Sequence, residues 1–208
     1  MSTTFATYKT IPTQLLGEPT TDFEGIVGAW VNIARREFCV RRNWNFLKAQ
    51  TTYTTESTTN TFLITLFSST AAKIININIA GEEDPVTYMN PKRFQQLFPP
   101  DQISAGTPEY YTQIGSTIYF DATVSTDTVL YIIYIKNITD VDATHDETDI
   151  PDRYVHCIFY NLLMHGAYWQ EMANKATIAR TLYESAVMQV IQDEGDNPDE
   201  DIVFWDGA

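Results

Sequence analysis

The chain has 208 residues, a formal net charge of −14, and hydrophobic and aromatic contents of 44% and 13%. This length suffices for one large domain or two small ones, and the composition is that of a globular protein. No stretch approaches the ~20 apolar residues of a membrane span. The N-terminus also lacks the charged and then apolar pattern of a secretory signal. We therefore expect a globular protein with no membrane partner.

The negative charge is concentrated in the last third of the chain. Residues 1–137 hold 10 basic and 12 acidic side chains, whereas residues 138–208 hold 3 basic and 15 acidic ones. Tight DNA binding needs lysines and arginines that replace the counterions of the phosphates, so this charge disfavours sequence-specific DNA binding. Charge of this size also keeps proteins soluble, and that simpler explanation stays open.

The first predicted element is a helix over residues 22–42. Basic side chains fall mostly outside its apolar face, which repeats at helical spacing. The residues of that face are Phe23, Ile26, Val27, Trp30, Val31, Ala34 and Phe38. After the helix we expect Trp44 and Phe46 to anchor the chain in the core.

The middle of the chain has the pattern of β-strands. Threonines are frequent in residues 51–59, which is typical of strands and their turns. Ile75, Ile77 and Ile79 alternate with asparagines, as in a half-buried strand. A short helix is predicted between strands, and the last strand is too apolar to be solvated on either face. The expected strands are residues 61–67, 75–79, 109–113, 117–120 and 128–136, and the short helix is 91–98.

The last third is predicted to contain an acidic loop and two helices. The loop is residues 139–150, with five carboxylates, and Pro151 and Asp152 then suit the first turn of a helix. Residues 154–169 are almost all apolar, so we expect this helix to be buried on nearly all sides. A final helix over residues 175–193 has one apolar face, and Gly195 can end it. That face carries Ala179, Leu182, Tyr183, Ala186 and Val190.

The order helix, strand-rich middle, two helices predicts an α+β fold. We expect residues 1–49 and 138–195 to form a helical bundle from the N-terminal helix and the two C-terminal helices. Residues 50–137 would be a β-rich domain inserted into it, and residues 196–208 an extended acidic C-terminal tail.

The tail ends in an apolar cluster that its acidic composition does not explain. The last sixteen residues carry seven carboxylates and no basic side chain. Burial of one aromatic side chain is worth roughly 1.5–3 kcal/mol, so the cluster should either fold back onto its own domain or dock on another chain. We expect docking on a partner. This C-terminal apolar cluster consists of Ile202, Val203, Phe204 and Trp205.

The sequence contains no recognised catalytic motif. Glycine-rich phosphate loops, G-x-S-x-G, H-E-x-x-H and C-x-x-C are all missing. His156 and Cys157 are adjacent, but helical neighbours point about 100° apart, so we expect both in the core. Cys39 and Cys157 are expected to be buried reduced thiols. His145 lies among loop aspartates without metal-ligand spacing, so we expect no enzyme, cofactor or metal.

Four arginines near the end of the first helix form a basic cluster beside Trp44. Arginines next to an aromatic ring have the chemistry of a nucleic-acid patch. Because fifteen carboxylates lie in the last third of the chain, we favour pairing with acidic helices of the same or a neighbouring chain. The arginines, which are candidates for contacts between subunits, are Arg35, Arg36, Arg41 and Arg42.

The chain resembles a known protein family in the order of several motifs. They are the Gly17-Glu18-Pro19 turn, the Arg42-Asn43-Trp44-Asn45-Phe46 helix exit, Gly106-Thr107-Pro108-Glu109-Tyr110-Tyr111, Tyr134-Ile135 and Ile150-Pro151-Asp152-Arg153-Tyr154. In this order the chain resembles the head-to-tail adaptor proteins of short-tailed double-stranded DNA phages, also called tail tubular protein A or gatekeeper proteins. The resemblance covers most of the chain and includes no catalytic signature.

The resemblance implies a structural role in the virion, at the head–tail interface, after assembly in the host cytoplasm. It implies a homo-oligomeric ring, generally of twelve copies, that binds the portal protein above and the tail nozzle protein below, with tail fibre proteins as further partners. DNA would pass through the channel without specific binding, since an acidic lumen repels the duplex. Contacts in such a ring are heterologous, so the arginines and the acidic third could form the two complementary faces.

Two other functions stay open at this point. The acids of residues 140–149 could serve a phage-associated cell-wall hydrolase, because the separation of carboxylates cannot be seen in a sequence. The chain could also be a non-viral intracellular binding module with an acidic tail.

Overall fold

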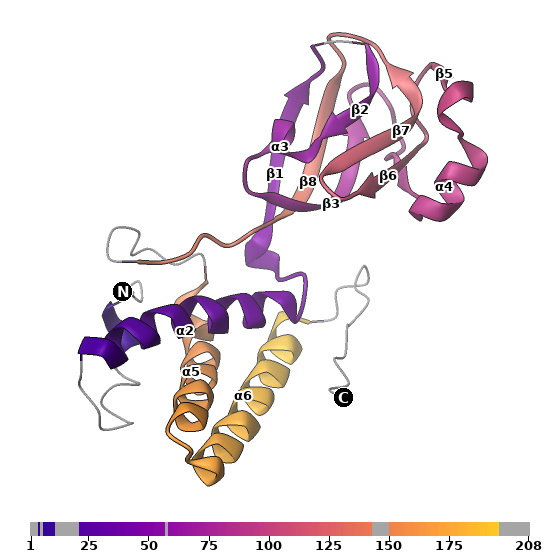
Figure 1. Ribbon diagram of the computed structural model, residues 1–208. Coiled ribbons are helices and arrows are strands. Elements are labelled where there is room, and N and C mark those ends of the chain that lie inside the picture. Colours follow the sequence, from indigo (N-terminus) through magenta and orange to yellow (C-terminus); the bar gives the residue numbers. More distant parts are fainter. Residues whose placement is uncertain (1–3, 5, 11–20, 57, 143–149, 196–208) are drawn as a thin grey trace. The chain divides into compact units, whose positions relative to one another are not determined.

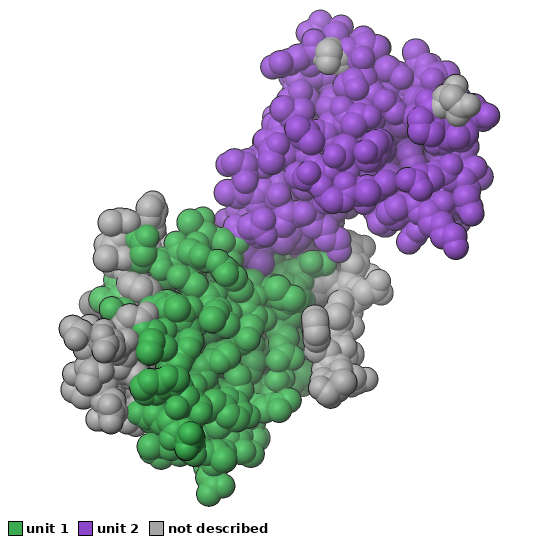
Figure 2. Space-filling view, viewed as in Figure 1, with its two compact units in different colours: residues 1–46, 138–208 green, residues 47–137 purple. Residues whose placement is uncertain are grey.

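The computed structural model describes residues 4, 6–10, 21–56, 58–142 and 150–195 (Figure 1). The chain forms two compact units, residues 1–46 with 138–208 and residues 47–137 (Figure 2). We call the first the helical unit and the second the β unit. The structure is a mixture of helices and two sheets, which confirms the predicted α+β class. None of the described helices is long and apolar enough to cross a membrane.

The helical unit is built on helices α2 (Thr21–Val40), α5 (Val155–Trp169) and α6 (Ala173–Glu194). Helix α5 contacts both other helices, and the short 3₁₀ turn η3 (Asp152–Tyr154) leads into it. The predicted helix over residues 22–42 is confirmed by α2. Its side chains at three- and four-residue spacing are buried, because they form one stripe on the helix. This stripe contains Val27, Val31, Ala34 and Phe38.

Two expectations for α5 and α6 were wrong in part. Helix α5 is not buried on all sides, since His156, Tyr168 and Trp169 are exposed. The reason is that α2 and α6, which α5 packs against, cover only part of its surface. On α6 we expected Leu182 on the apolar face, but it is 43% exposed, whereas Val187, which we did not assign to that face, is buried.

The exit from α2 is anchored by stacked aromatic rings, as predicted. Trp44 is fully buried and stacks on Phe38 with ring centroids 4.6 Å apart, and its Nε1 donates to the Phe38 carbonyl at 2.9 Å. The ring of Phe46 lies 6.1 Å from that of Trp44 and 5.8 Å from that of Tyr154. Because Tyr154 precedes α5, this cluster ties the end of α2 to the start of the C-terminal helices.

The β unit consists of two sheets. The first has the order β1-β8-β3 with antiparallel pairs, and the second has the order β2-β7-β6-β4, with β5 beside β7. The strands are β1 (Lys48–Thr54), β2 (Thr59–Leu63), β3 (Ala71–Ile79), β4 (Thr87–Tyr88), β5 (Ser104–Ala105), β6 (Tyr110–Ile114), β7 (Thr117–Val124) and β8 (Val129–Lys136). The helical elements are η1 (Asn45–Leu47), which enters the unit, α3 (Ile64–Phe67), α4 (Pro91–Leu97) and η2 (Pro100–Gln102).

Side chains from both sheets form one apolar core. Ile77 and Ile132 from the first sheet and Ile118 and Phe120 from the second are fully buried in the same cluster. Side chains alternate between the two faces of a strand, so each sheet turns one face to this core.

The structure corrects three details of the predicted strands. The strand expected over 61–67 ends at Leu63, and α3 follows. In β3 the register shifts between Ile74 and Asn76, so Ile74 is buried while Ile75 is only partly buried. Such an irregularity adds a residue to one strand and breaks the alternation. In β8, Tyr131 is 44% exposed, although we expected no solvated face.

Several predicted features lie outside the described residues. They are the Gly17-Glu18-Pro19 turn, His145 in the acidic loop, and the tail with the C-terminal apolar cluster.

Candidate interaction site on the helical unit

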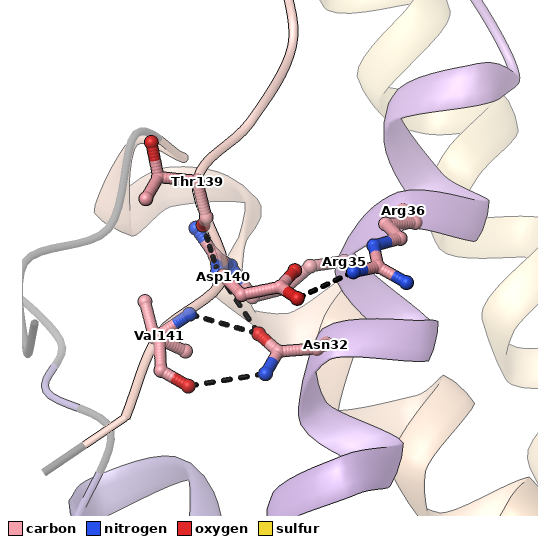
Figure 3. A network of polar contacts seen from close by, with 6 residues as sticks. All are labelled: Asn32, Arg35, Arg36, Thr139, Asp140 and Val141. Carbon is pink, nitrogen blue, oxygen red and sulfur yellow. Dashed lines mark hydrogen bonds and ion pairs between the residues drawn. The ribbon is translucent and has the colours of Figure 1, made fainter.

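Polar side chains of α2 hold the chain where it returns from the β unit (Figure 3). Asn32 makes a pair of hydrogen bonds with the backbone of Val141: Nδ2 donates to the carbonyl at 3.0 Å, and Oδ1 accepts from the amide at 2.9 Å. Arg35 is fully buried, and its Nη1 donates to the Thr139 carbonyl at 2.8 Å. Buried backbone groups need such partners, so these bonds fix the path of residues 139–141 along α2.

Arg36, the next residue of α2, forms an ion pair with Asp140 in the same segment (Figure 3). Both side chains are at least half exposed. An exposed pair contributes at most about 1 kcal/mol, because water and salt screen it. The charge of Arg36 therefore stays accessible at the surface.

The arginines that follow α2 hold helix α6. Arg41 Nη2 lies 2.8 Å from Glu184 Oε1, and its guanidinium lies 5.5 Å from the centre of the Tyr183 ring. Burial lowers the pKa of Arg41, but the neighbouring Tyr183 and Glu184 outweigh it and raise that pKa above its ordinary value. Arg42 donates to two carbonyls at the end of α6, that of Ile191 at 3.1 Å and that of Gly195 at 2.8 Å. A cation is favourable there because the last carbonyls of a helix carry partial negative charge.

A third polar contact joins α2 to α5. Glu37 Oε2 accepts from Asn161 Nδ2 at 2.7 Å and lies 3.2 Å from His165 Nε2. The hydrogen bond with His165 is the main reason that the pKa of Glu37 lies below its usual value, and burial acts in the opposite direction. Asn161 and His165 are four residues apart, so they lie on one face of α5.

These helices border an open groove of about 580 Å³. The groove is lined by residues of α2, α5 and α6 and by Arg41, which follows α2. Its apolar lining residues are Val40, Met164, Tyr168 and Tyr183. Its charged lining residues are Arg36, Glu37, Arg41, Arg180 and Glu184. Val40 is 68% and Tyr168 54% exposed, so the groove presents apolar surface to solvent.

The structure assigns each of the four arginines a contact within its own unit. Arg41 pairs with Glu184 of helix α6, as we favoured, whereas Arg36 pairs with Asp140 of the returning segment and not with a helix. Arg35 and Arg42 bond to backbone carbonyls. Of the four, Arg36 has the most exposed side chain, whereas Arg35 is fully buried. Their role in contacts between subunits stays a prediction.

The adjacent His156 and Cys157 do approach each other, contrary to our expectation. Cys157 Sγ lies 3.7 Å from His156 Nε2. His156 is exposed rather than part of the core, whereas Cys157 is fully buried as expected. Burial raises the pKa of the Cys157 thiol to about 12, so it is protonated at neutral pH and is a poor nucleophile. Cys39 is free but only partly buried.

Within the described residues, no group of three or more His, Cys, Asp or Glu side chains could hold a metal ion. The polar contacts of the helical unit instead connect helices and returning chain.

Sequence reasoning missed several residues of this site. Asn32 and Glu37 went unnoticed because their partners, Val141 and Asn161, are 109 and 124 residues away. A signal was present in α5, where Asn161 and His165 are polar residues at helical spacing in an otherwise apolar segment. The groove depends on the spacing of helices, which no local pattern reports.

Comparison with known families supports the structural interpretation. The chain matches the family described as SU10 adaptor protein over residues 3–200. Because the match covers nearly the whole sequence, the chain belongs to the SU10 adaptor protein family. A comparison with curated proteins finds no match.

Membership in this family confirms the resemblance to phage head-to-tail adaptors. It makes the chain a structural protein of the virion that interacts with other phage structural proteins. The short-tailed class of phage stays a prediction.

Proposed function

We propose that this chain joins the capsid to the tail, as a ring of twelve copies between the portal and the tail nozzle. The family match over residues 3–200 is the observation that carries the proposal. In this role the chain lines the channel through which DNA leaves the capsid, and it offers attachment points for tail fibre proteins.

The distribution of charge supports this role. The last third carries a net charge of −12, from 3 basic and 15 acidic residues. An acidic channel repels the duplex and releases no counterions to it, so DNA slides without binding.

The arginines of the helical unit supply a basic face for the neighbouring subunit in this proposal. Arg36 is the best placed of them, since its side chain is 58% exposed and its pair with Asp140 is weakly held. Arg35, Arg41 and Arg42 then act by fixing the helices that present it. If Arg36→Glu left ring assembly unchanged, the proposed contact of Arg36 with the neighbouring subunit would be wrong.

The C-terminal apolar cluster supplies the second contact in this proposal. Ile202, Val203, Phe204 and Trp205 dock on the portal or a neighbouring subunit, as buried aromatic anchors do in other interfaces. The acidic residues before them give the segment charge complementarity to a basic partner surface.

The test is to mix the purified full chain with its portal and to image the mixture by negative-stain electron microscopy. The proposal predicts a ring of this protein on one face of the portal. A chain that stays monomeric in the presence of the portal would contradict it. A monomer in the absence of the portal is compatible with the proposal, because assembly segments often order only on binding.

A further inference from the structure

The groove between α2 and α6 contains an arginine that no described acid neutralises. Its charged residues are three arginines and two glutamates. Arg41 pairs with Glu184, Arg36 with Asp140, and Glu37 contacts Asn161 and His165. For Arg180, the described part of the chain offers neither an ion pair nor a side-chain hydrogen bond partner. The groove therefore combines apolar walls with an unneutralised positive charge.

The end of α6 is held by the residue next to a groove-lining arginine. Arg42 holds the Gly195 carbonyl, and its neighbour Arg41 lines the groove. Arg180, Glu184 and Ile191 are spaced by four and seven residues, so they form one stripe along α6. A segment that leaves Gly195 and runs back along this stripe thus reaches the groove without crossing to another face.

The length of the last segment fits this path. Arg180 lies fifteen residues before Gly195, which is about 22 Å along the helix at ~1.5 Å per residue. An extended chain spans about 3.3 Å per residue, so Ile202, seven residues after Gly195, reaches about 23 Å. On this path the C-terminal apolar cluster would begin level with Arg180, in the groove that Tyr168 also lines.

The composition of this segment complements the groove. Residues 199–201 are Asp, Glu and Asp, and the apolar cluster follows directly. Carboxylates next to Arg180 and Arg41 gain favourable contacts, while the apolar side chains cover Val40, Met164 and Tyr168. Tethering to α6 also gives the segment a high effective concentration, in the mM range for a short flexible link.

We propose that in the free subunit residues 199–205 occupy the groove of their own chain. The segment covers the exposed apolar walls, and the groove in turn keeps Phe204 and Trp205 from binding partners prematurely. The groove contact itself concerns the free subunit, and only its release on the portal or a neighbour rests on the proposed function.

Photo-cross-linking in the full chain tests this contact. Benzoylphenylalanine replaces Trp205, the dilute protein is irradiated, and the cross-linked peptides are identified by mass spectrometry. The proposal predicts cross-links within one chain to Val40, Met164 or Tyr168. Cross-links that join two chains would assign the groove to a second copy, and cross-links elsewhere, or none, would also overturn the proposal.

A matched pair of charge reversals tests the role of Arg180. Arg180→Glu and Lys175→Glu make the same change on α6, but only Arg180 lines the groove. We expect Arg180→Glu to lower the cross-link yield about fivefold, since it replaces an exposed ion pair by a repulsion of similar size. The yield of Lys175→Glu should match that of the parent. Equal cross-link yields in the two variants would contradict the role of Arg180 in holding the segment. Circular dichroism spectra that are equal for both variants show that the fold is intact. Portal binding is measured separately, so a failure here leaves the adaptor function untouched.

Discussion

The two units of this protein are stabilised in different ways. The β unit is one continuous stretch, residues 47–137, and an apolar cluster between its sheets forms its core. The helical unit is assembled from the two ends of the chain, and hydrogen bonds join residues 104 to 153 positions apart in the sequence. Doubling the length of a loop costs only ~0.6 kcal/mol, so the inserted β unit disturbs the helical unit little. What the helical unit needs is specific contacts between its two parts: Asn32 and Arg35 fix the returning chain, and Arg42 fixes the end of α6.

The largest effect is expected from the aromatic anchor of the helical unit. Trp44→Ala removes a fully buried side chain and its stacking on Phe38, so it should destabilise this unit by about 3–5 kcal/mol. Hydrogen exchange measured by mass spectrometry should show faster exchange in α2, α5 and α6, with the strands of the β unit unchanged. Ile132→Ala is the matched variant and should produce the opposite pattern. If both variants accelerated exchange throughout the chain, the two units would be one cooperative body.

A smaller effect is expected from the contact that holds the returning chain. Asn32→Ala leaves the amide and carbonyl of Val141 without their partner, at a cost of about 1–3 kcal/mol. Thr55→Ala is the equivalent change in the β unit, where the buried hydroxyl bonds to the backbone of Ser125 and Thr128. Urea unfolding followed by hydrogen exchange should show each variant weakening its own unit. If Asn32→Ala left the stability of the helical unit unchanged, its contact with Val141 would not be what holds the returning chain.

Acidification should weaken the helical unit through Glu37. Its pKa in the folded protein lies below its ordinary value of 4.5, so the unfolded chain binds the proton more tightly. The stabilisation is therefore complete above about pH 4.5 and is lost as the pH falls through the lowered pKa. Unfolding of Glu37→Gln, measured from pH 6 to pH 3, should depend less on pH than that of the parent. Glu56→Gln, an exposed change in the β unit, is the control and should keep the parent's profile.

The rate of thiol labelling should report on the accessibility of cysteines in the helical unit alone. This measurement uses the unmutated protein and changes no stability. Both cysteines lie outside residues 47–137, and burial raises the pKa of Cys157 to about 12. At pH 8 the Cys157 thiol is therefore protonated, and its burial blocks access as well. We expect iodoacetamide to modify the partly buried Cys39 first, as measured by peptide mass spectrometry. Equal labelling rates in native protein would mean that the helical unit opens readily.

Local patterns in the sequence predicted the elements of both units well. The 3.6-residue repeat of Val27, Val31 and Phe38 located α2, and the short apolar runs located β6, β7 and β8. The prediction that Trp44 anchors the helix exit also held, because a large aromatic after an amphipathic helix has few other places to go. These successes concern residues whose partners are close in sequence or whose burial follows from periodicity.

The features that escaped prediction depend on distant partners. The contact of Asn32 with Val141 requires knowledge of where the chain returns after the β unit. The bulge in β3, which turns Ile74 rather than Ile75 inwards, is set by the register with β8. The groove beside Arg180 is lined by side chains of α2, α5 and α6, and only the packed structure shows that these lie together.

The most direct test of the adaptor function is the native mass of the complex between the portal and this chain. One chain has a mass of 23.7 kDa, so a ring of twelve copies adds about 284 kDa (12 × 23.7) to the portal. The account predicts a single species with this increment, obtained by native mass spectrometry of the full chain mixed with portal. A portal mass that does not change, or a mixture of increments without a fixed number of copies, would contradict it.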